Sequence, residues 1–452
     1  MLDKLKPSQH TTTMSGLIPS EVTTLLIEAQ STDRLARLSV PSNAAEQQAL
    51  FMAGEIENPL FLFDDLVDFK QQEKRALTDA YKKAVFQLPL PDYEQRVYDA
   101  FGQSLDTEIA LGEVAKDAAL LRETNGDLSE TTQRFLTIRD EVYGELPVER
   151  YYDAVQYLRQ KFKKLSEIPE LTPHLDFIIR HTPLSPTTTV EPFFTEASTK
   201  RVVAAVETFG LQPKDETEKG GSDADRVVRS IQHYLHHLIE ATHWDAEAAD
   251  ILEPASTDRL QSTVRVNNNL KLANQQHFTE ITAHEGFHAY RAIMAQQIGS
   301  TALLIGLPGS HAIEEGLATT FGKVHSNAVG SLDSFDYPVF VAGLMDHEHC
   351  DFRTSYEVFW RVLMLFRYTT NNQLLQINAA EESQQLAYRI LCNETRVFDK
   401  PRYRSLANNA GVRDAWSYLD AHHDDPVALQ TLLIGKHDPS NSEHQSYLQN
   451  YI

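Results

Sequence analysis

The sequence predicts a mainly α-helical protein with a small β-sheet, an α+β fold. Apolar residues recur at helical spacing through most of residues 20 to 170, as in Leu77, Tyr81 and Val85. One segment, Val264 to Leu272, instead alternates apolar with basic residues around three asparagines, which is typical of a short strand or hairpin. Two helix-like segments that contain histidine and glutamate follow it, at residues 281–297 and 310–318.

The composition indicates a globular protein with a sizeable core. Of 452 residues, 42% are hydrophobic and 23% are charged. Asp and Glu number 64 against 41 Lys and Arg, which gives a formal net charge of −23. This charge repels the phosphates of nucleic acids and anionic lipid head groups, so we expect neither nucleic acid nor a membrane as a partner.

Three features of the sequence favour a cytoplasmic location. The two cysteines, Cys350 and Cys392, are too few for the disulfide framework of a secreted protein. Residues 1 to 16 lack the basic-then-apolar order of a signal peptide. The longest apolar runs, such as Ala302 to Leu307, fall far short of the ~18 residues that cross a bilayer.

A cluster of prolines between residues 169 and 192 divides the chain, because prolines at these intervals cannot continue a helix. An acidic, glycine-containing loop at residues 215–225 then precedes a helix-like stretch over 226–241. We therefore expect a flexible N-terminus over 1–19, a helical subdomain over 20–190 and a second domain over 191–452.

The most informative segment, residues 281–297, contains the H-E-x-x-H sequence His284-Glu285-Gly286-Phe287-His288. On an α-helix, residues i and i+4 lie ~40° apart around the axis and ~6 Å apart along it. The two imidazoles therefore converge on one point, which can hold Zn²⁺. Glu285 projects from the same half of the helix, where it can take a proton from a water on the metal. We expect this helix to stop at Gly299.

A third protein ligand is expected nearby, because hydrolytic zinc sites normally use three protein ligands plus water. Ser310 is a suitable N-cap for the second helix-like segment, which carries the adjacent residues Glu314 and Glu315. A helix, a turn and a second helix with a glutamate ligand are typical of zincin-like metallopeptidases of the glutamate class. Spacing alone does not distinguish Glu314 from Glu315, and both could instead complement the helix dipole.

The sequences HEGFH and EEGLA, preceded by Val264 to Asn269, resemble the QEGLA-motif family. These are the tyrosine/phenylalanine carboxypeptidase-domain proteins, which include the microtubule-associated tyrosine carboxypeptidases. The likeness covers roughly residues 190 to 440. The downstream segments that carry it are residues 351–357, 395–398, 414–419 and 432–436.

The resemblance implies a zinc metallopeptidase whose third metal ligand, beside His284 and His288, is Glu315. Glu314 then stands where the family usually has glutamine. The resemblance also implies that Glu285 is the general base and that the substrate is a peptide or protein C-terminus, from which a residue such as Tyr or Phe is removed. The first motif departs from the family pattern, in which three residues usually separate the histidines instead of two.

Two further elements would bind substrate in this interpretation. A strand edge beside the active-site helix aligns the substrate in zincins, and Val264 to Asn269 is the candidate here. A carboxypeptidase also needs a cation for the terminal carboxylate. Residues 396–404 (RVFDKPRYR) contain four basic residues and one acidic residue, 4 − 1 = +3, in an otherwise acidic chain. Arginine binds carboxylate bidentately, so Arg396 and Arg404 are the candidates. The same segment could instead pair with the acidic surface.

Other functions remain open at this point. One alternative is a zinc aminopeptidase or endopeptidase of the same class, and another is a catalytically silent binding protein with a structural zinc. Two further histidine-containing stretches, 233–243 and 346–350, lack a general base at a defined spacing and are typical of solvated faces or loops. The sequence does not indicate the oligomeric state.

Overall fold

The computed structural model of the chain describes most of the sequence. The described residues are 18–30, 41–67, 69–183, 194–211, 221–238, 241–251, 253–329, 336–371, 377–395, 398, 400–401 and 403–451. Three segments named above lie outside them: residues 1–17 of the expected flexible N-terminus, 184–193 of the proline-rich segment and 215–220 of the acidic loop.

The described part of the chain is mainly helical and contains a three-stranded sheet, which confirms the predicted α+β class. The helices before the sheet are α1 (Ser20–Gln30), α3 (Ala44–Met52), α4 (Asp64–Val67), α5 (Gln71–Phe86), α6 (Asp92–Glu123), α7 (Ser129–Tyr143), α8 (Val148–Phe162), η2 (Lys163–Glu167), α9 (Thr172–His181), α10 (Glu196–Glu207), α11 (Asp223–His233) and η4 (Tyr234–Leu238). The strands are β1 (Asp245–Ala249), β2 (Ala255–Asp258) and β3 (Thr263–Asn267). The helices after them are α12 (Gln275–Ile298), α13 (Thr301–Ile305), α14 (His311–His325), α15 (Tyr337–Ala342), η6 (Gly343–His347), α16 (Phe352–Asn371), α17 (Ile377–Thr395), α18 (Arg404–Ala421), α19 (Pro426–Leu432) and α20 (Ser442–Leu448).

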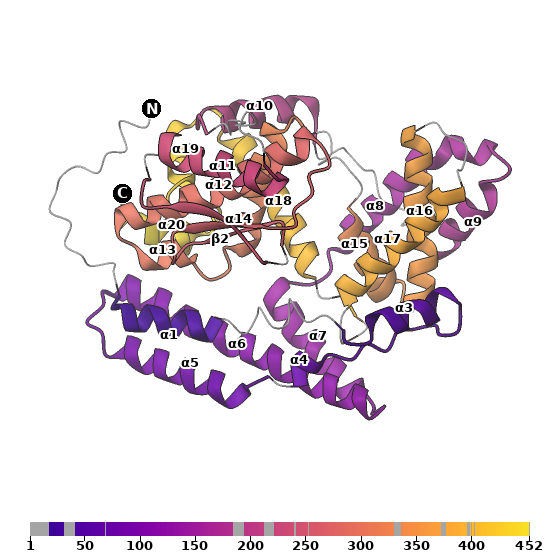
Figure 1. Ribbon diagram of the computed structural model, residues 1–452, viewed down its shortest axis with the longest axis horizontal. Helices are drawn as coiled ribbons and strands as arrows, with labels where there is room; N and C mark the ends of the chain where they lie inside the picture. The colour runs from indigo at the N-terminus through magenta and orange to yellow at the C-terminus, as the bar shows by residue number, and fades with distance from the viewer. Residues whose placement is uncertain are drawn as a thin grey trace.

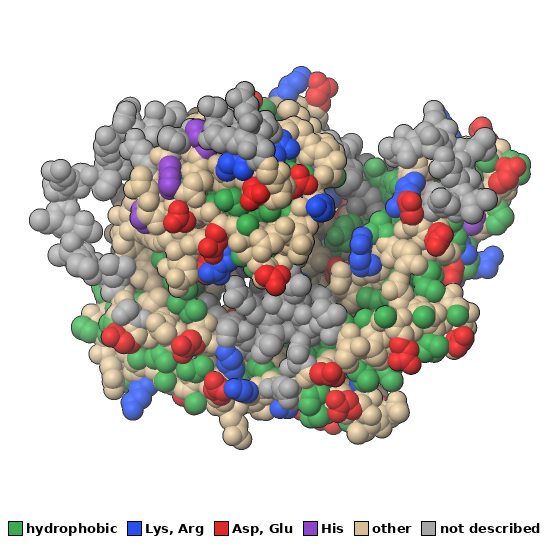
Figure 2. Space-filling view, in the orientation of Figure 1, with side chains coloured by type: hydrophobic (Ala, Val, Ile, Leu, Met, Phe, Trp, Pro, Cys, Tyr) green, Lys and Arg blue, Asp and Glu red, His purple; other side chains and the backbone are tan. Residues whose placement is uncertain are grey.

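These elements form two lobes joined along one long side. Helices α8, α9, α16 and α17 build one lobe, and the sheet with α10 to α14 and α18 to α20 builds the larger one (Figure 1). Helices α1 and α5 lie below the larger lobe, and α6 runs from there toward α4 and α7 (Figure 1). The surface is hollowed between the lobes, and apolar side chains are visible inside the hollow (Figure 2). Among the described helices, none combines the length and apolar character needed to cross a bilayer.

The hydrophobic core joins segments that are far apart in the sequence. One cluster packs α8 and α9 against α15, α16 and α17, and the fully buried Tyr151 and Phe359 belong to it. A second packs α1, α5 and α6 against α13 and α20, through residues such as Leu26 and Leu303. The expected boundary near residue 190 therefore does not separate two cores, because residues from both sides of it share these clusters.

The sheet has the strand order β1-β3-β2, with β1 parallel and β2 antiparallel to β3. On one face, Val264 and Val266 of β3 are fully buried in a cluster that includes α11 and α12. On the other face, Arg265 pairs with Glu247 of β1 and Asp258 of β2. The sheet therefore has one apolar face against the helices and one charged face.

This topology corrects two expectations about the segment 264–272. The hairpin partner of β3 is β2, and no strand forms at residues 270–272. The segment Val264 to Asn269 also cannot offer an edge to a substrate, since β3 is the central strand and both its edges are paired. Among the described strands, β2 has an unpaired edge and contacts α12 directly.

Helices α12 and α14 form an antiparallel pair that carries the H-E-x-x-H and E-E-G-L-A sequences. Glu280 near the start of α12 pairs with Lys323 near the end of α14, at 2.6 Å. Arg291 near the end of α12 pairs with Glu314 at the start of α14. Between these pairs, the rings of Phe287 and Phe321 stack with their centroids 4.2 Å apart. Polar pairs at both ends and an apolar contact between them therefore fix how the two helices lie.

The ends of these helices lie close to the expected positions. Asn274 caps α12 by accepting a hydrogen bond from the backbone of His277, and Gly299 ends the helix in the left-handed conformation with φ 74°, as predicted. Ser310 does precede α14, but its hydroxyl makes no capping hydrogen bond, contrary to expectation. The helix predicted over 226–241 is instead α11, which begins at Asp223 and passes into the π-helix η4.

Gly316 of α14 and Gly411 of α18 let the backbones of their helices touch. A Cβ atom at Gly316 would overlap the carbonyl group of Gly411, and a Cβ at Gly411 would overlap the carbonyl of Ala312. Glycine at both positions therefore allows α18 to hold the first turns of α14 in place. These are the turns that carry Glu314 and Glu315.

Replacing Gly316 by alanine is expected to lower the free energy of unfolding by at least about 1–3 kcal/mol, because backbone atoms cannot move aside as a flexible side chain can. Urea denaturation followed by circular dichroism would measure the loss. The matched control is Gly102→Ala in α6, where a Cβ would meet only the side chain of Lys82. That variant should be neutral or stabilised by up to about 1 kcal/mol. Equal stability of the two variants would contradict this interpretation of Gly316.

Candidate metal centre

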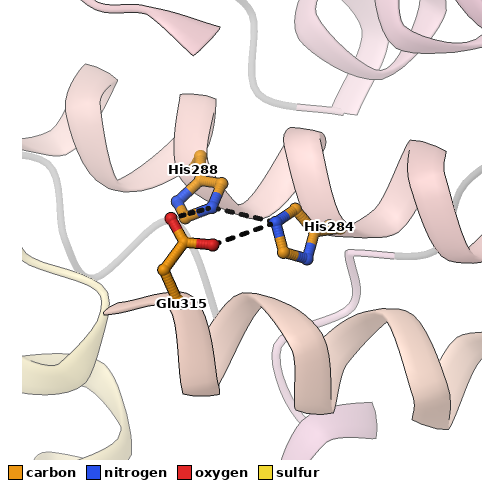
Figure 3. A group of neighbouring side chains, drawn as sticks. All are labelled: His284, His288 and Glu315. Carbon is orange, nitrogen blue, oxygen red and sulfur yellow. Dashed lines mark hydrogen bonds and ion pairs between the residues drawn. The ribbon is translucent and has the colours of Figure 1, made fainter. Parts of the chain in front are cut away.

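The side chains of His284, His288 and Glu315 converge on one point between α12 and α14 (Figure 3). The Nε2 atoms of His284 and His288 lie 3.2 Å apart. One carboxylate oxygen of Glu315 lies 3.6 Å from Nε2 of His288, and the other lies 3.7 Å from Nε2 of His284. Among the His, Cys, Asp and Glu side chains of the described residues, these three lie close enough together to hold a metal ion.

These separations fit a small four-coordinate cation. Ligand bonds of ~2.0–2.1 Å in a tetrahedron place neighbouring ligand atoms roughly 3.3 Å apart. Two imidazole nitrogens and one carboxylate oxygen are also a donor set that zinc uses in catalytic sites. The side chains of His284 and Glu315 are 25% and 30% exposed. The group therefore has an open side toward solvent, where a fourth ligand that is not a protein residue can lie.

The ionisation states of His284 and Glu315 also suit metal binding. Burial, and then the neighbouring His288, lower the pKa of His284. Its imidazole is therefore neutral at neutral pH, as a metal ligand must be. Burial alone would raise the pKa of Glu315, but the imidazolium charges present at acidic pH outweigh it and lower that pKa to about 2. Glu315 is consequently an anion across the physiological range.

Glu314 lies behind His288, on the side away from Glu315. One of its carboxylate oxygens is 2.7 Å from Nδ1 of His288. A carboxylate accepts hydrogen bonds only, so this contact places the ring proton on Nδ1 and leaves the lone pair of Nε2 directed at the point shared with His284 and Glu315. The structure thus separates the two glutamates that sequence spacing could not: Glu315 faces the candidate metal position, and Glu314 orients one of the histidines.

Two cations hold Glu314 in its ionised state. Arg291 donates to one of its oxygens, and Nζ of Lys436 lies 3.0 Å from the other. Burial alone would raise the pKa of Glu314, but Arg291, Lys436 and then His288 outweigh it and hold the pKa well below its usual range. Burial, and then the charge of Arg259, lower the pKa of Lys436 to about 8. Because Arg291 and Lys436 pair with it, Glu314 keeps its negative charge although only 2% of the residue is exposed.

Replacing Glu314 by glutamine is expected to weaken zinc binding about 10- to 100-fold, because the partner that fixes the ring of His288 loses its charge. Competition with a chromophoric chelator would measure the affinity of the folded variant. The matched control is Glu280→Gln, which removes a carboxylate from α12 at the pair with Lys323. Wild-type zinc affinity in a correctly folded Glu314→Gln variant would show that Glu314 does not support the site.

Glu285, the candidate base, is 8% exposed and follows His284 on α12. Its Oε2 accepts a hydrogen bond of 2.8 Å from the hydroxyl of Thr257 in β2. The next residue, Gly286, packs against the ring of Tyr234 in η4. A Cβ atom added to Gly286 would lie 3.2 Å from that ring. The glycine in this motif therefore has a packing role on the face of α12 that meets η4.

Of the two candidate carboxylate-binding arginines, one can be located. Arg396 lies outside the described residues. Arg404 is the first residue of α18 and is half-buried, and it forms no hydrogen bond or ion pair with His284, His288 or Glu315. The structure therefore does not bring Arg404 together with the candidate metal ligands. Two described cations near them, Arg291 and Lys436, are bound to Glu314 behind His288. A third, Arg259, acts electrostatically on Glu314 and Glu315 and donates to the backbone carbonyls of Leu304 and Ile305.

The other histidine-containing stretches have structural partners. His236 lies 2.9 Å from the backbone carbonyl of Trp244. His347 shares a 2.8 Å hydrogen bond with the hydroxyl of Tyr152. Asp346 accepts hydrogen bonds from both Arg139 and Tyr403. These contacts agree with the interpretation of both stretches as polar groups of helices and loops.

Sequence reasoning missed Thr257 and the two cations that hold Glu314. Arg291 follows His288 by three residues, so the helical periodicity of α12 placed it near the motif. Lys436 ends the segment 432–436 that carries part of the family resemblance, which was a usable signal. Nothing in the short polar sequence of β2 pointed to Thr257.

Comparisons with protein-family models, with curated proteins and with solved structures found no match for this chain.

Proposed function

We propose that this chain is a zinc-dependent metallopeptidase of the zincin-like type. The observation that carries the proposal is the convergence of His284, His288 and Glu315, open to solvent on one side, next to Glu285. A structural zinc site has four protein ligands, whereas a hydrolytic one keeps a position for water. Three converging ligands with an adjacent carboxylate favour hydrolysis over the alternative of a silent zinc-containing protein.

His284, His288 and Glu315 would hold the zinc, which when bound lowers the pKa of water and polarises the scissile carbonyl. Glu285 accepts the proton of the attacking water and then passes it to the leaving amine. Glu314 keeps Nε2 of His288 directed at the metal position. The unpaired edge of β2 is suited to hold an extended peptide by backbone hydrogen bonds next to Glu285.

The direction of cleavage proposed here is that of a carboxypeptidase, which rests on the family resemblance. Zinc-loaded protein would be offered peptides that differ only in a free or an amidated C-terminus, with several C-terminal residues including Tyr and Phe. Mass spectrometry of the products should show loss of one C-terminal residue from the free peptides only. Replacing Arg396 by Ala should weaken that cleavage if this residue binds the terminal carboxylate.

A specific observation supports a second candidate, an endopeptidase or aminopeptidase of the same class. No described strand pairs with the outer edge of β2. Such an edge can hold a chain that continues on both sides of the scissile bond. Cleavage that is unchanged by amidation would favour this candidate, and the cleaved bond would distinguish its two forms. Absence of hydrolysis by fully zinc-loaded protein would contradict the enzyme proposal.

A further inference from the structure

Thr257 connects the open strand edge to the candidate base. It is the third residue of β2, and its hydroxyl donates the 2.8 Å hydrogen bond to Oε2 of Glu285. Its side chain shares a sheet face with the buried Val264, which is its cross-strand partner. That face packs on α12, so the strand backbone fixes where the hydroxyl meets Glu285.

The register of β2 shows which way its backbone groups point. Residues directly opposite each other in an antiparallel pair alternate between hydrogen-bonded and non-hydrogen-bonded positions. The backbone N–H of Asn267 donates to the carbonyl of Pro254 at 3.0 Å, which marks that pair as hydrogen-bonded. The pair Ser256 and Arg265 is then hydrogen-bonded, and the pair Thr257 and Val264 is not. The N–H and C=O of Thr257 therefore point away from β3, to the unpaired edge.

We infer that Thr257 is a positioning residue that couples the register of a bound peptide to the orientation of Glu285. This inference rests on the proposed metallopeptidase function. No described strand pairs with the outward backbone groups of Thr257, so they are available to an extended substrate, and its side chain donates a hydrogen bond to the base. A peptide bound along β2 is thus aligned against the same residue that orients the carboxylate.

The hydrogen bond also gives the two carboxylate oxygens of Glu285 different roles. Oε2 is held by the hydroxyl of Thr257, so Oε1 is the oxygen left to accept the proton of the attacking water. That proton then moves to the leaving nitrogen as the peptide bond breaks, and the threonine keeps its own proton throughout. Losing the hydroxyl leaves the base present but free to rotate, which lowers the fraction of complexes aligned for reaction.

The test compares Thr257→Val, which keeps the shape and removes the hydroxyl, with Thr257→Ser, which keeps the hydroxyl. In zinc-loaded protein, Thr257→Val should lower kcat about 10-fold or more with KM within about twofold of wild type, because only positioning of the base is lost. Thr257→Ser should restore most of kcat. The pair Thr257→Ser and Thr257→Ala repeats the comparison with smaller side chains. Thr279→Val on α12, whose hydroxyl donates to the backbone carbonyl of Gln275, is the matched control and should leave kcat unchanged.

Two readouts besides turnover separate positioning from a general structural defect. Zinc stoichiometry and the thermal midpoint of unfolding should be the same in the Val and Ser variants. In a crystal structure of metal-free Thr257→Val, the Glu285 carboxylate should be displaced from its wild-type orientation. In a crystal structure of metal-free Thr257→Ser, it should keep the wild-type orientation.

The inference is overturned if Thr257→Val turns over like wild type, if Thr257→Ser is as impaired as Thr257→Val, or if the effect appears in KM alone. Absence of hydrolysis by the zinc-loaded wild type is a different result, because it removes the proposed function and the inference with it.

Discussion

Replacing Glu285 by glutamine is expected to reduce peptide hydrolysis at least ~10²-fold while zinc remains bound. The amide has the shape of the carboxylate and can still accept the hydrogen bond from Thr257. It cannot accept a proton from water. Steady-state kinetics with a peptide substrate, together with zinc analysis of the same samples, would measure both effects.

The control for this substitution is Glu280→Gln, five residues earlier on α12, where the carboxylate pairs with Lys323. That variant should keep near wild-type turnover. Comparable turnover by zinc-loaded Glu285→Gln and by wild type would mean that Glu285 is not the base, and the function proposed here would lose its mechanism.

Replacing His284 by alanine is expected to remove most of the bound zinc and, with it, the activity. His288 and Glu315 would then be the remaining protein ligands, and two ligands plus water make a poor site. His284 forms no hydrogen bond or ion pair with the buried Glu314 and Arg291, so the fold should survive its loss.

Elemental analysis after dialysis against a weak chelator would test this expectation. Wild type should hold about one zinc per chain, and His284→Ala should hold a small fraction of that. His277→Ala, at the start of the same helix, is the matched control and should keep full occupancy. Full stoichiometric zinc in folded His284→Ala would show that this histidine is not a ligand.

The helix that carries the H-E-x-x-H sequence could be predicted because its signals are local. Two histidines at i and i+4 share a face, and Gly299 ends the helix because it adopts a left-handed conformation. The candidate ligand group needed one further fact, namely which of two adjacent glutamates faces α12 from α14. That depends on how α14 is rotated, which the contact of Gly316 with Gly411, about a hundred residues away, helps to fix.

The strand edge was placed on the wrong strand for a related reason. Of the three described strands, β3 is the one that alternates polar residues with bulky, β-branched valines, a pattern that identifies a strand in a sequence. The sequences of β1 and β2, DAEAA and ASTD, are short and contain no bulky apolar residue, and alanine, aspartate and glutamate are depleted in strands. Which strand is central follows from long-range pairing, and composition does not encode it.

The hydrophobic core crosses residue 190, where the sequence predicts a division, because core packing also depends on contacts between distant segments. The amphipathic faces of α15, α16 and α17 are covered by helices from the first half of the chain. A proline-rich segment marks where a helix stops, but the partner of an apolar face is chosen by the whole fold.

The central claim is that His284, His288 and Glu315 hold one catalytic zinc with an open position. Anomalous scattering at the zinc absorption edge, from crystals of the zinc-loaded protein, tests it most directly. We expect a single peak per chain, about 2.0–2.2 Å from Nε2 of both histidines and from a carboxylate oxygen of Glu315, with its fourth side toward solvent. No peak at that point, or a fourth protein ligand that closes the site, would contradict the claim.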